Sequence, residues 1–257
     1  PVGFALLAAA ALPLERAWDV ALSALLAFGL SVIVYFAWGF AFQFGGLGLW
    51  NATMGYRGLS LHWSALGPAY GRGWGMLGWS GFLLGGSANT LDVYHLFLAQ
   101  APLVTTATLI PLLALRRRVP ALVTLLAGLL MAGVVYPALG NWAWGGGWLA
   151  QLGRTLNFGH GVADLGGAGV VHLAGGALAL VGLLLFAPAQ RQAETPIQLP
   201  AAHLPLLGVL GALLLPAGLW AALLAQPWPT GSALVPEVIG VNLILAAGPA
   251  ALLPGLY

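Results

Sequence analysis

The chain has 257 residues, of which 60% are hydrophobic, and it carries only 8 basic and 6 acidic side chains. A water-soluble domain carries charge on roughly a quarter of its residues, so this composition excludes a soluble globular enzyme and a disordered protein. The formal net charge of +2 is too small to attract an anionic polymer, which excludes a nucleic-acid-binding protein. The sequence therefore predicts an all-α polytopic membrane protein, with residues 1–257 forming a single transmembrane domain.

Seven apolar segments follow one another along the chain. A helix needs about 20 apolar residues to cross a bilayer. Residues 1–14 are too few for that and look like the second half of a helix. Residues 45–90 are rich in Gly and Trp, which favours a long loop at headgroup depth with a short interfacial helix near residues 74–84. The spans that we predict are residues 20–44, 91–115, 121–139, 164–186, 204–224 and 234–253.

The arginines predict the orientation in the membrane. Cytoplasmic loops carry an excess of Arg and Lys, and Arg116, Arg117 and Arg118 are the strongest positive cluster in the sequence. We therefore expect this loop to be cytoplasmic and the protein to lie in the plasma (inner) membrane. Alternation of the spans then places Asp164, at the start of the fifth of the seven segments, on the outer side.

Two ionisable residues of the fifth segment are candidate functional residues. A charged group inside a span is unfavourable unless it is paired or faces a cavity. His172 follows Asp164 by eight residues, which is about 12 Å along a helix and on the same broad face. One interpretation is a polar path that both side chains line. The other is that Asp164 caps its helix by accepting backbone N–H groups and that His172 hydrogen-bonds a neighbouring helix. The sequence alone leaves both open.

Signals for a cofactor, a metal or catalysis are missing from the sequence. There is no Cys, so neither a disulfide nor a thiolate metal site is expected. No two His residues have the spacing of a metal site, and there is no phosphate loop, nucleophile elbow or pair of carboxylates. We therefore expect no cofactor, no metal and no enzymatic activity.

Several stretches resemble one family of membrane proteins. Residues 161–176, which read GVADLGGAGVVHLAGG, resemble the fifth-helix signature of the ammonium transporter/Rhesus family. Residues 135–137 (VYP) and 141–149 (NWAWGGGWL) resemble the end of its fourth helix, and residues 97–100 (FLAQ) resemble the start of its third. The order and spacing of these stretches agree with the family over residues 91–176.

The resemblance implies a fold and a substrate. The family has eleven helices in two inverted halves, a pore between the halves of each subunit, and a trimeric assembly. About seven of the eleven segments are expected here, with a partial first helix and most of the second repeat missing, so the chain looks like an incomplete or truncated, divergent member. The implied partners are ammonium or ammonia, the lipid bilayer and two further copies of the chain.

Six residues take roles by this resemblance. Trp144 matches the tryptophan that recruits ammonium at the outer vestibule through a cation–π contact. Asp164 matches the structural carboxylate near the entrance, and His172 matches the first of two pore histidines. The remaining three depart from the family, because Leu103 and Ala222 fall where it has gate phenylalanines and Gln226 falls near its vestibule serine; we expect all three to line the pore.

Two functions remain open at this point. The first is an ammonium or ammonia channel or transporter with an outer Trp vestibule leading to a His-lined pore. The second is a non-transporting, degenerate relative that acts as a structural or assembly component of a larger membrane complex, together with other membrane subunits. The altered gate positions favour the second function, whereas Trp144, Asp164 and His172 favour the first.

Overall fold

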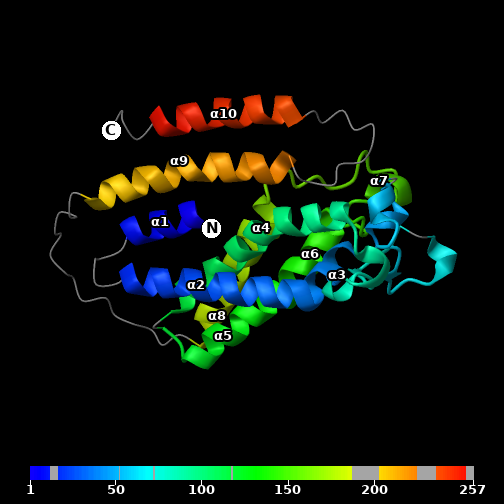
Figure 1. The fold of residues 1–257 in the computed structure, drawn as a ribbon, viewed down its shortest axis with the longest axis horizontal. Coiled ribbons are helices and arrows are strands. Elements are labelled where there is room, and N and C mark those ends of the chain that lie inside the picture. Colours follow the sequence, from blue (N-terminus) through cyan, green and yellow to red (C-terminus); the bar gives the residue numbers. More distant parts are fainter. Residues whose placement is uncertain are drawn as a thin grey trace.

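The computed structural model describes residues 1–11, 17–51, 53–71, 73–116, 118–186, 203–224 and 236–252. In this part of the chain the architecture is a bundle of helices (Figure 1). The α-helices are α1 (Val2–Ala10), α2 (Ala17–Val34), α3 (Phe40–Phe44), α4 (Leu91–Leu115), α5 (Ala121–Leu130), α6 (Tyr136–Ala143), α7 (Leu152–Thr155), α8 (Ala174–Phe186), α9 (His203–Leu224) and α10 (Pro236–Leu252). Three π-helical segments continue these helices: η2 (Tyr35–Gly39), η8 (Met131–Val135) and η9 (Ala168–Leu173).

Five helical segments of the described chain are long and apolar enough to cross a membrane. They are Trp18–Leu49, Leu91–Leu115, Ala121–Ala143, Ala168–Phe186 and Leu204–Leu223. Together with the shorter α1 and α10, they confirm the all-α polytopic fold and the order of the predicted segments. The fourth predicted segment continues to Ala143, and the fifth begins at Ala168 instead of residue 164.

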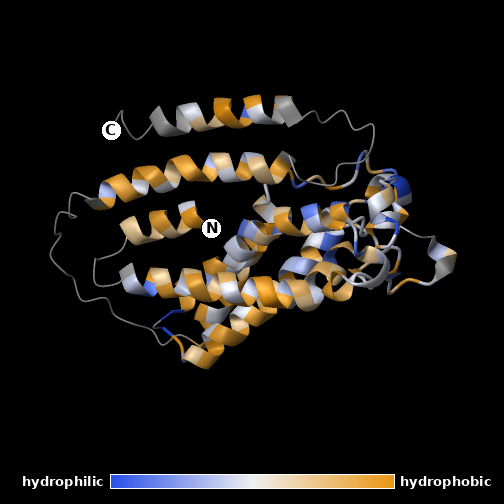
Figure 2. Cartoon of the chain, viewed as in Figure 1, coloured by the Kyte–Doolittle hydropathy of each residue, from blue (hydrophilic) through white to orange (hydrophobic). Residues whose placement is uncertain are grey.

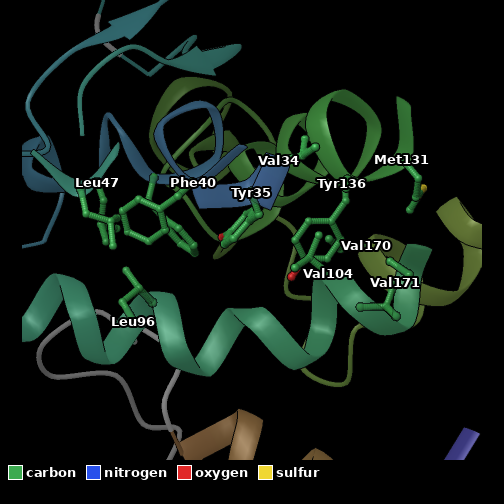
Figure 3. Close-up of a cluster of buried hydrophobic side chains, with 14 of the residues drawn as sticks. Val34, Tyr35, Phe40, Leu47, Leu96, Val104, Met131, Tyr136, Val170 and Val171 are labelled. Atoms are coloured by element: carbon green, nitrogen blue, oxygen red, sulfur yellow. The ribbon is translucent and has the colours of Figure 1, made fainter. Parts of the chain in front are cut away.

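Helix α4 lies at the centre of the bundle and carries one side of its main hydrophobic core. Figure 3 shows Leu96 and Val104 of α4 facing the aromatic rings of Phe40, Tyr35 and Tyr136. The Tyr35 ring packs against that of Tyr136 at 6.0 Å and 72°. Offset and edge-on contacts of this kind stabilise aromatic pairs beyond the area that they bury.

The π-helical segments η2 and η8 are braced against each other. A π-helical turn widens the helix and disturbs its regular hydrogen-bond ladder. The indole N–H of Trp38 in η2 donates to the Gly133 carbonyl oxygen in η8 at 3.0 Å. A side chain at Gly133 would occupy the place of this indole. The two segments therefore depend on each other for close packing.

Helix α9 lies toward the rim of the bundle, beside α1, with α10 farther out (Figure 1). Helices α1 and α9 meet at two glycines, where a methyl group on Gly3 would lie 2.7 Å from the Gly211 carbonyl oxygen. Small residues allow this close approach in membranes. Figure 2 shows hydrophobic residues along most of α9, as expected for a helix whose surface is largely apolar.

Residues 45–90 form a cap over one end of the bundle. The short strands β1 (His62–Trp63) and β2 (Leu77–Gly78) pair antiparallel, with His62 opposite Gly78. The cap docks on the end of α3, because the Gly45 carbonyl oxygen accepts the Leu61 N–H at 2.9 Å and the Ser80 hydroxyl at 2.7 Å.

The predicted interfacial helix near residues 74–84 is wrong. Strand β2 occupies part of this stretch, and a single 3₁₀ turn, η6 (Phe82–Leu84), follows it. Gly81 and Leu83 have φ angles of 85° and 55°, in the left-handed region that interrupts a right-handed helix. Hydrogen bonds to other parts of the cap and to Gly45 hold this stretch in a non-helical conformation, despite its apolar composition.

The opposite end of the bundle holds an ion pair. The Nε atom of Arg116, directly after α4, lies 3.0 Å from Oδ1 of Asp19 at the start of α2. Helix α5 begins nearby at Ala121, and its span ends at Ala143 on the side of the cap. The structure thus separates the arginine loop from the cap by the length of a span, as the predicted alternation requires.

Candidate functional site

Trp144 lies where helix α6 ends, beneath the cap. Its backbone N–H donates to the Gly140 carbonyl oxygen at 2.8 Å, which closes the last turn of the helix. Its indole N–H donates to the backbone carbonyl oxygen of Asp164 at 2.7 Å, and its ring packs edge-on against Tyr136 at 6.4 Å. The half-buried ring is therefore held by a hydrogen bond at its nitrogen and by an edge-on contact with the Tyr136 ring.

Asp164 lies in the loop before η9 and caps that segment. Its Oδ2 atom accepts the backbone N–H of Gly169 at 3.1 Å and that of Val170 at 2.8 Å. A carboxylate at a helix N-terminus satisfies free donors and interacts favourably with the helix dipole. The part of the second interpretation that concerns Asp164 is thus confirmed. The prediction that Asp164 shares one helix with His172 is wrong, because the helix begins at Ala168, directly after Gly167 with its φ of 71°.

A small pocket lies beside Trp144. Its walls come from α4, the 164–167 loop and α9, and they include Leu103, Trp144 and Ala222. The other lining residues, 165–167, 219 and 223, are Leu or Gly. The cavity volume of about 10 Å³ is roughly the room that one water molecule needs. Two of the predicted pore residues therefore lie in one pocket with the predicted recruitment residue, in a lining that is aliphatic apart from the indole.

His172 is not part of this pocket. It lies in η9, with an exposed side chain whose ring centroid is 6.3 Å from that of Phe4 in α1. Gly166 in the preceding loop and Gly176 in α8 also have open space where a side chain would be. The histidine therefore faces outward from the described helices, on the side of α1. Gln226 lies outside the described residues.

A buried polar cluster beside the pocket was missed by the sequence analysis. The Tyr35 hydroxyl donates to Gln43 Oε1 at 2.7 Å, Gln43 Nε2 donates to Gln100 Oε1 at 3.2 Å, and the Tyr136 hydroxyl donates to the same Gln100 oxygen at 2.7 Å. All four side chains are fully buried. A glutamine inside an apolar span is the signal that could have revealed the cluster, because a buried amide requires partners.

Metal ligation finds no support in the described part of the chain, where no three His, Asp or Glu side chains come together. The site offers an indole ring in the wall of a small apolar pocket, and a nearby carboxylate that caps η9. Together with the fold, this defines a polytopic helical membrane protein with a small pocket at one end of its bundle.

Comparison with known sequences identifies the family. The Ammonium Transporter Family matches residues 1–223, so the chain belongs to this family. Over 188 residues it is 29% identical to ammonium transporter Amt2 of Archaeoglobus fulgidus, an alignment that covers 72% of this chain and 35% of the relative. It is also 27% identical over 218 residues to ammonium transporter 1 member 3 of Solanum lycopersicum, covering 83% of this chain and 42% of the relative.

A bacterial ammonium transporter is also similar to this chain, over a shorter stretch. The ammonium transporter of Bacillus subtilis is 34% identical over 110 residues, which is 42% of this chain and 25% of the relative. The chain spans less than half of the length of each of these relatives. Its family and its integral membrane character follow from these matches and from the apolar helices.

Proposed function

We propose that this chain forms the outer recruitment site and part of the pathway of a membrane transporter or channel for ammonium or ammonia. The observation that carries the proposal is the shared pocket of Trp144, Leu103 and Ala222. The names of the related proteins, all ammonium transporters, support the choice of substrate. A transport role also fits a site whose polar groups hold the backbone and offer no reacting side chain at the pocket.

Trp144 is the proposed recruitment residue. A cation over an indole face gains about 0.5–2 kcal/mol, and the gain is larger when water is excluded. The hydrogen bond from its N–H to the Asp164 carbonyl oxygen holds the indole in the wall of the pocket. The carboxylate of Asp164 adds negative charge near the entrance while it caps η9.

Beyond Trp144, the aliphatic lining favours a neutral species. Burying an ion without partners is far more unfavourable than burying a small polar molecule. Leu103 and Ala222 offer no hydrogen bond, so ammonia passes this part more readily than ammonium does. We propose His172 as the next polar group along the path, and Gln226 as a further pore residue. Because only the neutral species enters this lining, ammonium gives up its proton to water on the outer side of Trp144.

The proposed setting is that of the family as described above. We propose that residues 1–257 act as one transmembrane domain, in a homotrimer in the plasma membrane, with the loop at Arg116–Arg118 in the cytoplasm. The cluster of arginines at residues 116–118 supports this orientation, since cytoplasmic loops carry an excess of Arg and Lys.

Uptake of labelled methylammonium by cells without their own ammonium transporters tests the function. We expect uptake by the full chain. In Trp144→Leu the apparent affinity for methylammonium should be about 2- to 30-fold weaker, because a cation–π contact is lost. In His172→Ala we expect little transport. Trp63→Leu, which changes an exposed tryptophan of the cap, serves as the control and should leave uptake unchanged. A membrane-inserted chain without uptake, recovered together with other membrane subunits, would contradict transport and favour the non-transporting structural role.

A further inference from the structure

Gln43, in helix α3, is held on every side by the surrounding helices. Its side chain accepts from the Tyr35 hydroxyl and donates to Gln100, and its backbone carbonyl oxygen accepts Nδ2 of Asn141 at 2.8 Å. The residue is fully buried. A buried amide is unfavourable unless both of its ends are hydrogen-bonded, and here both ends are. Gln43 therefore has one defined orientation.

The turn that carries Trp144 packs directly on Gln43. A methyl group added to Gly140 would collide with the Gln43 amide, and one added to Gly145 would collide with its backbone carbonyl oxygen. Asn141, between them, makes the hydrogen bond to that same carbonyl oxygen. Three residues within one turn of Trp144 thus rest on Gln43, so its position determines where the backbone of Trp144 lies.

The ring of Trp144 is connected to Gln43 through Tyr136. The Tyr136 hydroxyl and Gln43 Nε2 share Gln100 Oε1 as their acceptor. The Tyr136 ring in turn packs edge-on against the indole. The indole N–H also donates to the backbone carbonyl oxygen of Asp164. The indole is therefore held between two anchors, one of which is centred on Gln43.

We infer that Gln43 is a positioning residue that sets the angle of Trp144 in its pocket and thereby the affinity of the pocket for ammonium, without touching the ion itself. Only the link to ammonium affinity rests on the proposed function. The positioning of the indole follows from the contacts alone and is measurable without any transported substrate.

Fluorine NMR of the full chain labelled with 5-fluorotryptophan tests the positioning. The resonance of Trp144 is assigned by its loss in Trp144→Phe. We expect Gln43→Leu to shift this resonance or to broaden it. Ser31→Ala is the matched control, because Ser31 is equally buried and bonds Thr105 at 2.9 Å outside this cluster; it should leave the resonance in place. An unmoved Trp144 resonance in Gln43→Leu would overturn the inference.

Tyr136→Phe is the second variant, for the case that Gln43→Leu does not insert into the membrane. It keeps the ring against Trp144 and removes only the hydroxyl. We expect a smaller shift of the same resonance. If Tyr136→Phe and Ser31→Ala both leave the resonance unchanged, the connection through Gln100 does not position the indole and the inference fails.

Uptake kinetics test the consequence for affinity. In Gln43→Leu we expect the apparent KM for methylammonium to rise about three- to tenfold, with a maximal rate within about twofold of the wild type, because part of a cation–π contact is lost. A fall in maximal rate with an unchanged KM would contradict a positioning role. If the wild-type chain shows no uptake but the resonance of Trp144 moves in Gln43→Leu, the proposed function fails and the positioning stands.

Discussion

Helices α4 and α9 have similar lengths and similar apolar character but very different surroundings. The most apolar stretch of α4 is 56% buried in the bundle, whereas that of α9 is only 17% buried. Helix α4 carries Gln100 and three buried threonines, Thr105, Thr106 and Thr108, whose hydroxyls bond its own backbone. Helix α9 is almost entirely aliphatic. In a membrane, the central helix is therefore the one with polar groups, because only there do they find partners.

Gln100→Leu removes the acceptor at the centre of the buried cluster and gives the largest expected effect. Two buried donors, Gln43 Nε2 and the Tyr136 hydroxyl, lose their partner. Each unpaired donor costs about 1–3 kcal/mol, so we expect a loss of about 2–6 kcal/mol in the free energy of unfolding. Unfolding in mixed detergent micelles, followed by circular dichroism, measures it.

The rim offers the matched control for this substitution. Asn242, on the outer helix α10, is exposed to the surroundings of the bundle. Asn242→Leu should change the free energy of unfolding by less than about 0.5 kcal/mol, as surface substitutions do. Equal losses of unfolding free energy in Gln100→Leu and Asn242→Leu would contradict the difference between the central helix α4 and the outer helix α10.

Adjacent glycines on α8 test the same contrast within one helix. A methyl group on Gly175 would lie 2.9 Å from Ile110 and 3.0 Å from the Ala107 carbonyl oxygen of α4, whereas one on Gly176 would meet nothing within 4 Å. We expect Gly175→Ala to destabilise by about 1–3 kcal/mol, through overpacking against a backbone that cannot yield. Gly176→Ala should be neutral or stabilising by up to about 1 kcal/mol, since Ala favours helix. Thermal unfolding of both variants measures these two changes. A larger loss of stability in Gly176→Ala than in Gly175→Ala would refute the packing of α8 on α4.

Hydropathy predicts the positions of the spans well. It fails where backbone hydrogen bonds determine the conformation. Span 91–115 agrees with α4 at both ends, because Thr90 accepts a backbone N–H as a helix cap and Arg116 ends the apolar run. The predicted segment 164–186 starts later than expected, because Gly167 interrupts the helix and Asp164 caps it from the loop. The stretch at 74–84 is apolar enough for an interfacial helix, yet its hydrogen bonds run to other parts of the cap and to Gly45.

The pocket contains Leu103, Trp144 and Ala222 from the sequence prediction, but the sequence did not predict how these side chains are held. The family motif supplies Trp144 and Asp164, and the structure adds that the indole bonds the Asp164 backbone across 20 residues of chain. No local pattern encodes such a contact. Gln43 and Gln100 lie in spans that apolar periodicity treats as uniform, so their pairing is visible only once α3 and α4 are packed together. Polar residues in apolar spans are thus the signal to search for first.

Arg116→Gln probes the end of α4 and α2 that lies opposite the cap, with a smaller expected effect. The side chains of Arg116 and Asp19 are only 27% and 14% exposed, so their ion pair is stronger than one in open water. We expect a loss of about 1 kcal/mol in the free energy of unfolding, reduced in high salt. Arg118→Gln, at an exposed position in the same loop, should change it little. Identical losses for both variants would mean that the loop charge matters and the ion pair does not.

Acid should destabilise the cap without affecting α9. Among the changes predicted here, we expect this one to be the smallest. Burial between Gly46 and Gly75 lowers the pKa of His62 from its usual 6.5. Because the folded cap favours the neutral imidazole, its stability is complete above pH 6.5 and declines as the pH falls below that value. The Leu61 amide donates to the Gly45 carbonyl oxygen and reports on the cap. When the pH is lowered from 7.5 to 5.5, its hydrogen exchange, corrected for intrinsic rates, should therefore speed up about two- to fivefold more than that of the α9 amides. His62→Gln should remove the difference; a difference that persists in this variant would assign the loosening to another group.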